Sequence, residues 1–277
     1  MKIYKHWAKA TAEARTEAGL LKLECLGGSE TSAEDAAAKA REKAAHAAER
    51  MTSGETLGEY PYPDRPLREE FLGEITRDGR LVGAVTRNSR GSLVLNAANV
   101  MFVDIDRPRE PAFAWLKRLF GGRVEGVEEK VVARVRNVVD TTPMLGLRLY
   151  RTAGGYRCLI TSGIYDPKSP ESRALLERFG SDPLYIRLCE VQESYRARLT
   201  PKFWRCDAAA PPTRFPWVDA DHEAKYRQWE QSYARHVVGY ATCALMGSFG
   251  VTAVVPEAQQ ILEVHDKFAC TGADELA

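Results

Sequence analysis

The segment Val100-Met101-Phe102-Val103-Asp104-Ile105-Asp106 joins an apolar run to two aspartates. Alternate side chains of a strand point to the same face, so a strand here places the carboxylates of Asp104 and Asp106 side by side. Two carboxylates at that spacing repel each other unless a cation lies between them. Mg²⁺ or Mn²⁺ is the usual cation, because it takes carboxylate oxygens and can hold a phosphate opposite. Salt bridges to Arg107, Arg109 or Arg151 are the structural alternative.

A second feature follows along the chain, where Gly146–Thr152 and Tyr156–Ser162 are predicted strands joined by Ala153-Gly154-Gly155. Glycines let a backbone approach a ligand closely, and arginine and threonine side chains supply donors that suit phosphate. The pattern predicts phosphate or nucleotide contacts from these residues: Arg151, Thr152, Gly154, Gly155 and Arg157. A plain hairpin with solvated arginines explains the same pattern.

The third feature is basic and lies between Tyr195 and Arg205. Arg196 and Arg198 share a face of the predicted strand Tyr195–Thr200, and Lys202 follows. Aromatic residues are interleaved with these cations, and such mixtures are typical of nucleic-acid or nucleotide binding. A lattice of salt bridges between these arginines and the Asp pair is the competing interpretation.

The order of the three features resembles that of the archaeo-eukaryotic primase and primase–polymerase superfamily. The resemblance covers Val100 to Arg205 and rests on Asp104 and Asp106, on Ala153–Arg157 and on Arg196–Lys202. It implies a primase-polymerase-like core and a metal-dependent nucleotidyltransferase, in which Asp104 and Asp106 are the catalytic and metal-binding residues for Mg or Mn.

Two departures from that family bear on activity. The family's second motif carries a histidine that contacts nucleotide phosphate, and Arg157 stands at this place. A third carboxylate lacks a recognisable motif; Glu190, Glu193 and Asp207 are the candidates. Three hypotheses therefore stay open: a metal-dependent enzyme acting on nucleotides or nucleic acid, a non-catalytic nucleic-acid or nucleotide-binding protein on the same fold, and a protein of unrelated fold.

The surrounding sequence mixes strands and helices with several hairpins, which favours an α+β fold with a mostly antiparallel sheet and flanking helices. Arg77-Asp78-Gly79 between apolar runs predicts a hairpin of Leu67–Thr76 with Arg80–Thr86. The other predicted strands are Lys2–Ala10, Gly19–Leu26 and Ser92–Leu95, and the other predicted helices are Ser32–Met51, Pro111–Phe120, Glu125–Val139, Ser169–Phe179, Pro183–Gln192 and His222–Met246. We expect a core domain at 1–205 and a Pro-rich linker with a C-terminal helical segment at 206–277.

Charge is distributed unevenly along the 277 residues, although 39 Lys and Arg nearly balance 38 Asp and Glu. Residues 101–205 carry 19 positive and 13 negative side chains, whereas residues 206–277 carry 5 and 10. The segment that holds all three features is therefore the basic one, as a phosphate-binding protein requires.

Several classes of protein are excluded or disfavoured by what the sequence lacks. No run approaches the roughly 20 apolar residues of a membrane-spanning helix, and the Met1–Trp7 start lacks a signal-peptide core. The six cysteines form no C-x-x-C pair, so we expect reduced thiols in a cytoplasmic protein. A P-loop is absent, and Arg107-Pro108 after Asp106 does not fit haloacid-dehalogenase-type phosphatases.

Overall fold

Two four-stranded antiparallel sheets form the body of the protein. The computed structural model describes residues 1–55, 67–107 and 126–277. The first sheet has the order β11-β7-β8-β6 and the second β3-β4-β5-β9. Their strands are β3 Glu70–Arg77, β4 Arg80–Arg87, β5 Leu93–Ala97, β6 Phe102–Asp106, β7 Gly146–Thr152, β8 Gly155–Ile160, β9 Tyr195–Arg198 and β11 Cys243–Gly250. The predicted α+β class with antiparallel sheets and flanking helices is thereby confirmed.

One hydrophobic core joins these sheets to the surrounding helices. It takes buried side chains from both sheets and from α3, α4, α5 and α7. The helices are α1 Ala33–Thr52, α3 Val127–Asp140, α4 Pro170–Phe179, α5 Pro183–Gln192, α6 Ala220–His236 and α7 Pro256–Ala269. Short 3₁₀ turns, η2 Phe203–Arg205 and η3 Val237–Gly239, and a small parallel pair, β10 Tyr240–Ala241 with β12 Glu275–Leu276, complete the fold.

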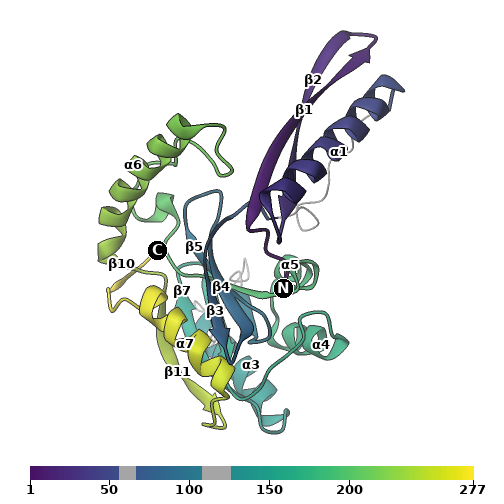
Figure 1. The fold of residues 1–277 in the computed structure, drawn as a ribbon. Coiled ribbons are helices and arrows are strands. Elements are labelled where there is room, and N and C mark those ends of the chain that lie inside the picture. The colour runs from purple at the N-terminus through teal and green to yellow at the C-terminus, as the bar shows by residue number, and fades with distance from the viewer. Residues whose placement is uncertain (56–66, 108–125) are drawn as a thin grey trace, which may run out of the picture.

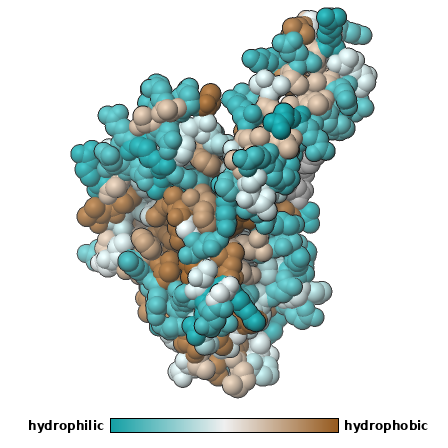
Figure 2. Space-filling model, in the orientation of Figure 1, coloured by the Kyte–Doolittle hydropathy of each residue, from teal (hydrophilic) through white to brown (hydrophobic). Residues whose placement is uncertain are grey.

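The N-terminal residues build a unit that projects from the body (Figure 1). Strands β1 His6–Thr16 and β2 Gly19–Ser29 pair along their whole length, and α1 packs on one face of the hairpin. Gly27 allows this close approach, since a Cβ there would lie 2.2 Å from the main-chain oxygen of Ala36. Ser32 caps α1 as predicted by accepting a hydrogen bond from the Asp35 N–H. On the face in view in Figure 2 this unit is mainly hydrophilic, whereas apolar side chains gather in the middle of the body.

Both predicted hairpins of the body are confirmed. Asp78 and Gly79 take positive φ angles of 48° and 73° between β3 and β4, as a two-residue hairpin turn requires. In the second hairpin Thr152 pairs with Gly155, so that Ala153 and Gly154 form the turn. Helices α4 and α5 begin at prolines and end at the predicted residues.

Two sequence predictions differ clearly from the structure. The strand expected at Lys2–Ala10 is His6–Thr16, because eleven consecutive residues pair with β2. The helix expected at His222–Met246 ends at His236, and Cys243–Gly250 is instead a strand that pairs with β7. The aromatic residues upstream are spaced as in a helix, but pairing with the edge of the sheet decides the conformation of Cys243–Gly250.

The tail beyond Met246 holds a helix that the sequence analysis missed. Five residues of α7 spaced along one face are buried, namely Ala258, Ile261, Leu262, His265 and Ala269. Residues 206–277 therefore contribute β11 and α7 to the body, while α6 forms a smaller aromatic cluster with Tyr226, Trp229 and Tyr233. The predicted helix Pro111–Phe120 and most of the predicted loop before Pro66 lie outside the described residues. Among the described helices, none is long and apolar enough to span a membrane.

Candidate phosphate-binding crevice

The candidate site lies where the edge strands of the two sheets meet. Strand β6 is the edge of one sheet and β9 the edge of the other. Tyr185 of α5 connects them: its hydroxyl lies 3.1 Å from the main-chain oxygen of Phe102 and accepts a hydrogen bond from the Arg196 N–H at 3.2 Å. Because a buried tyrosine hydroxyl needs partners, this arrangement fixes the spacing of the two edges.

The Asp pair lies at the end of β6, on one face, as predicted. Asp104 is half-buried and pairs in register with Arg157, while Asp106 is exposed and pairs with Gly155. Burial raises the pKa of Asp104; the positive charges of Arg157 and Arg198 partly offset this, and Asp106 adds to it. The Asp104 carboxylate is therefore near enough to two arginines and to a second carboxylate to be affected by the charges of all three.

Arg157 is the best-anchored cation of the site, with only 6% of the side chain exposed. Its guanidinium donates to the main-chain oxygen of Arg198 at 3.0 Å and contacts Nε2 of His265 at 3.1 Å. The other ring nitrogen of His265 lies 2.9 Å from a carboxylate oxygen of Asp266. A neutral imidazole satisfies both contacts: Nδ1–H donates to Asp266 and Nε2 accepts from Arg157.

Two cysteines complete the surroundings of His265. Sγ of Cys243 lies 3.8 Å from Nε2 of His265 and 3.6 Å from Sγ of Cys270. The Cys270 thiol and His265 both lower the pKa of Cys243. Such a trio is chemically able to hold a metal ion. However, the lone pair of Nε2 already accepts the Arg157 hydrogen bond, so we assign the trio to the support of Arg157.

A cluster of further cations lies beside Asp104 on and after β9. Burial, then the charge of Arg157, lowers the pKa of Arg198 to about 10. Burial, then the charges of Arg198, Arg205 and Arg90, lowers the pKa of Lys202 to about 8. Within residues 1–55, 67–107 and 126–277, no ion pair joins Arg157, Arg198, Lys202 or Arg205 to a carboxylate.

The predicted phosphate-binding residues divide into two groups. The charges of Arg157, Arg198, Lys202 and Arg205 act on one another beside Asp104, and we use crevice as the name of this cluster at the line between β6 and β9. The turn residue Gly154 lies beside it, since a Cβ there would lie 3.5 Å from Nη2 of Arg205. Gly155 packs against the Ile105 main chain, and Thr152 is its partner in the hairpin.

Arg151 and Arg196 are engaged elsewhere. Arg151 forms an exposed ion pair with Glu128 at 2.7 Å. Arg196 forms a buried ion pair with Glu69 at 2.6 Å and donates to the Asn96 side chain at 2.6 Å. Both arginines therefore pair with carboxylates, whereas among the described residues no carboxylate forms an ion pair with Arg157, Arg198 or Lys202.

The candidates for a third carboxylate do not lie at the Asp pair. Glu190 pairs with Arg173, Glu193 pairs with Lys2 and Lys168, and Asp207 accepts a hydrogen bond from Tyr240. The sequence analysis missed Asp182, whose main-chain N–H donates to the Asp104 main-chain oxygen at 3.0 Å and whose charge acts on Asp104. Its carboxylate caps α5 by accepting from the Leu184 N–H at 3.1 Å.

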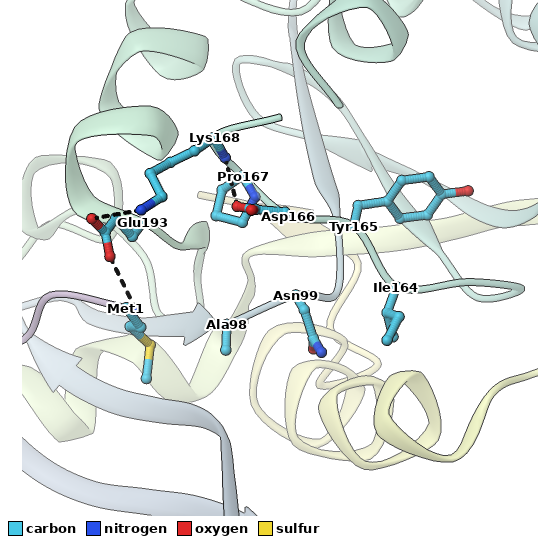
Figure 3. A pocket seen from close by; sticks show the side chains of 9 residues that line it. All are labelled: Met1, Ala98, Asn99, Ile164, Tyr165, Asp166, Pro167, Lys168 and Glu193. Atoms are coloured by element: carbon cyan, nitrogen blue, oxygen red, sulfur yellow. Dashed lines mark hydrogen bonds and ion pairs between the residues drawn. The ribbon is translucent and has the colours of Figure 1, made fainter. Parts of the chain in front are cut away.

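Two cavities lie outside this crevice. The larger, about 520 Å³, is lined by Asn99, Lys168, Glu193 and neighbouring residues, and Figure 3 shows Lys168 directed at Glu193. The charges of Lys168 and Glu193 compensate each other. Among its described lining residues, this cavity therefore does not have the excess of positive charge that the crevice has. The smaller, about 320 Å³, lies at the start of α3 beside Arg107 and Arg151.

Comparison with known proteins gives no relative. No protein-family model matches the chain, and no curated protein or solved structure is significantly similar to it. The function is therefore argued from the crevice alone.

Proposed function

We propose that the crevice binds the phosphates of a nucleotide or nucleic acid. The observation that carries this proposal is the cluster of four neighbouring cations, Arg157, Arg198, Lys202 and Arg205, beside a single half-buried aspartate, Asp104. In the described part of the chain none of the four forms an ion pair with a carboxylate. Partly buried cations are costly unless they are paired, and proteins accept this cost chiefly at functional sites.

The lowered pKa of Lys202 supports an anionic ligand rather than an internal role. Burial and three neighbouring cations disfavour its charged form. A phosphate group placed among these side chains would relieve both effects, because it supplies several acceptor oxygens and the missing negative charge. Arg157 and Arg198 come from different sheets, so the ligand would bind across the crevice.

The order of the motifs supports placing this activity on a primase-polymerase-like core. Asp104 of the Asp pair is the register partner of Arg157, whose guanidinium donates to the main-chain oxygen of Arg198 on the basic strand. An arginine at the family's histidine position would still supply a phosphate-binding charge. We expect the protein to act in the cytoplasm, where its six free thiols stay reduced.

Anisotropy of a labelled single-stranded oligonucleotide, titrated with the protein at several salt concentrations, tests the proposal. Phosphate binding by these cations predicts an affinity that falls steeply as the salt concentration rises. An affinity that does not depend on salt, or no binding at low salt, would exclude it.

Metal-dependent nucleotidyl transfer is the second candidate, and the shared face of Asp104 and Asp106 favours it. These two carboxylates would hold Mg²⁺ or Mn²⁺, which would stabilise the charge on the transferred phosphate. The fit is incomplete, because Asp182, the described third carboxylate whose charge acts on Asp104, is used as a helix cap. Incorporation of labelled nucleotide by the wild type but not by Asp106→Asn, with Mn²⁺ present, is the result this candidate requires.

A further inference from the structure

Trp204 stands beside the proposed phosphate site with its ring open to solvent. It belongs to η2, between Lys202 and Arg205, and 44% of the residue is exposed. The other tryptophans that the structure describes, Trp7, Trp217 and Trp229, are half-buried or buried. An exposed indole at this place needs an explanation other than packing.

Cations surround the ring. The Arg90 guanidinium lies 5.0 Å from the ring centroid of Trp204 and the Lys202 ammonium 5.2 Å from it. The ring of Phe203 packs edge-to-face with that of Trp204, with 4.8 Å between the ring centroids. In the described part of the chain neither Arg90 nor Lys202 has an ion-pair partner, so both remain able to contact a ligand phosphate.

The backbone that carries Trp204 is fixed before any ligand binds. The Arg205 N–H donates to the Lys202 oxygen at 2.8 Å, and the Ala208 N–H donates to the Phe203 oxygen at 3.0 Å. Just upstream, the Tyr233 hydroxyl donates to the Pro201 oxygen at 2.5 Å. On the opposite side, the Asn88 side chain accepts from the Arg90 N–H at 3.0 Å. Because this backbone is already ordered, ligand binding has to restrict only the Trp204 side chain.

We propose that Trp204 stacks on an unpaired base of single-stranded nucleic acid whose phosphates occupy the cluster of Arg198, Lys202 and Arg205. Every base offers an aromatic face, and alternating rings and cations bind strands without reading their sequence. Bases inside a duplex are already stacked on each other, so an exposed indole selects unpaired ones. The inference rests on the proposed function, since it needs the phosphates in the crevice.

An abasic oligonucleotide separates the stacking from the phosphate contacts, because it keeps the backbone charge and lacks the bases. For the wild type we expect the base-bearing strand to bind at least about fivefold more tightly than the abasic strand of equal length. Trp204→Ala should abolish this difference and leave the affinity for the abasic strand within about twofold. Trp204→Phe should retain part of the difference. Unchanged melting temperatures of both variants serve as the control for folding.

Two results would overturn the stacking assignment while the phosphate site stands. In the first, Trp204→Ala binds both strands as the wild type does; in the second, it weakens both strands equally. If the wild-type protein binds neither strand at low salt, the phosphate site itself is wrong and the stacking assignment falls with it.

Discussion

The guanidinium of Arg157 donates a 3.0 Å hydrogen bond to the main-chain oxygen of Arg198, across the line where the two sheets meet. This contact joins β8 to β9, and the charges of both arginines act on Asp104. The crevice is thus built from the two sheets together, with His265 behind Arg157 as its second support.

His265→Leu should destabilise the fold and weaken oligonucleotide binding. The change leaves the Arg157 guanidinium without its Nε2 acceptor and Asp266 without one donor. Unsatisfied groups of this kind lower the free energy of unfolding by about 1–3 kcal/mol. His265→Gln keeps an acceptor and should recover part of both losses. Urea denaturation and anisotropy measure the two effects, and a His265→Leu protein as stable as the wild type would refute the assigned support.

Binding should weaken as the pH rises through about 8, because Lys202 then loses its charge. The effect should be absent in Lys202→Arg, which stays charged over this range. The effect of pH on the free energy of unfolding has the opposite sign. The pKa of Lys202 is about 8 in the folded protein and 10.5 in the unfolded chain. Between these two values the unfolded chain binds more protons, so the contribution of Lys202 to stability increases with pH. Anisotropy between pH 7 and 9 is the measurement, and equal pH dependence in both proteins would remove Lys202 from the site.

Asp106→Asn should tighten oligonucleotide binding in EDTA by a few fold, because it removes an exposed negative charge beside the cations. If the Asp pair holds a divalent ion, Mn²⁺ should tighten nucleotide binding by the wild type and not by this variant. Titrations with and without Mn²⁺ distinguish the two effects. Equal responses to Mn²⁺ in both proteins would rule out a metal bound by Asp106.

The two turn glycines should respond differently to alanine. A Cβ at Gly155 would lie 2.1 Å from the Ile105 main-chain oxygen, so Gly155→Ala should destabilise the fold by about 1–3 kcal/mol. A Cβ at Gly154 would lie 3.5 Å from Nη2 at the flexible end of Arg205, so Gly154→Ala should leave stability nearly unchanged. Thermal unfolding compares the pair, and equal melting temperatures would show that the hairpin does not sit against β6 as described.

Local signals predicted the elements around the crevice because each has its own cause in the sequence. The apolar run before Asp104, the two glycine-containing turns and the capping residues Ser32 and Ser169 act over a few residues. The α+β class followed from their order along the chain.

Long-range partners could not be predicted in this way. His265 lies 108 residues from Arg157, and its helix carries no motif that points to a binding site. Arg196 and Arg198 share a strand and a residue type, yet the fold pairs Arg196 with Glu69, whereas among the described residues no carboxylate forms an ion pair with Arg198. Strand β11 was missed because the helical spacing of aromatic residues in α6 continues to Tyr240, past the end of the helix at His236. The pairing with β7, which makes Cys243–Gly250 a strand, is a long-range contact.

The most direct test of the phosphate site compares Arg198→Ala/Lys202→Ala with Arg41→Ala/Lys43→Ala, which removes two exposed charges from α1 on the projecting unit (Figure 1). The affinity of each protein for a single-stranded oligonucleotide is measured against salt concentration. The crevice variant should lose at least about tenfold in affinity, and its slope of log affinity against log salt should flatten by about 1.4. The α1 variant should keep the wild-type affinity and the wild-type salt slope. Lys202→Ala alone should lower the affinity and flatten the slope, but by less than the double variant does. If folded crevice and α1 variants bind alike, the cations of the crevice do not bind phosphate.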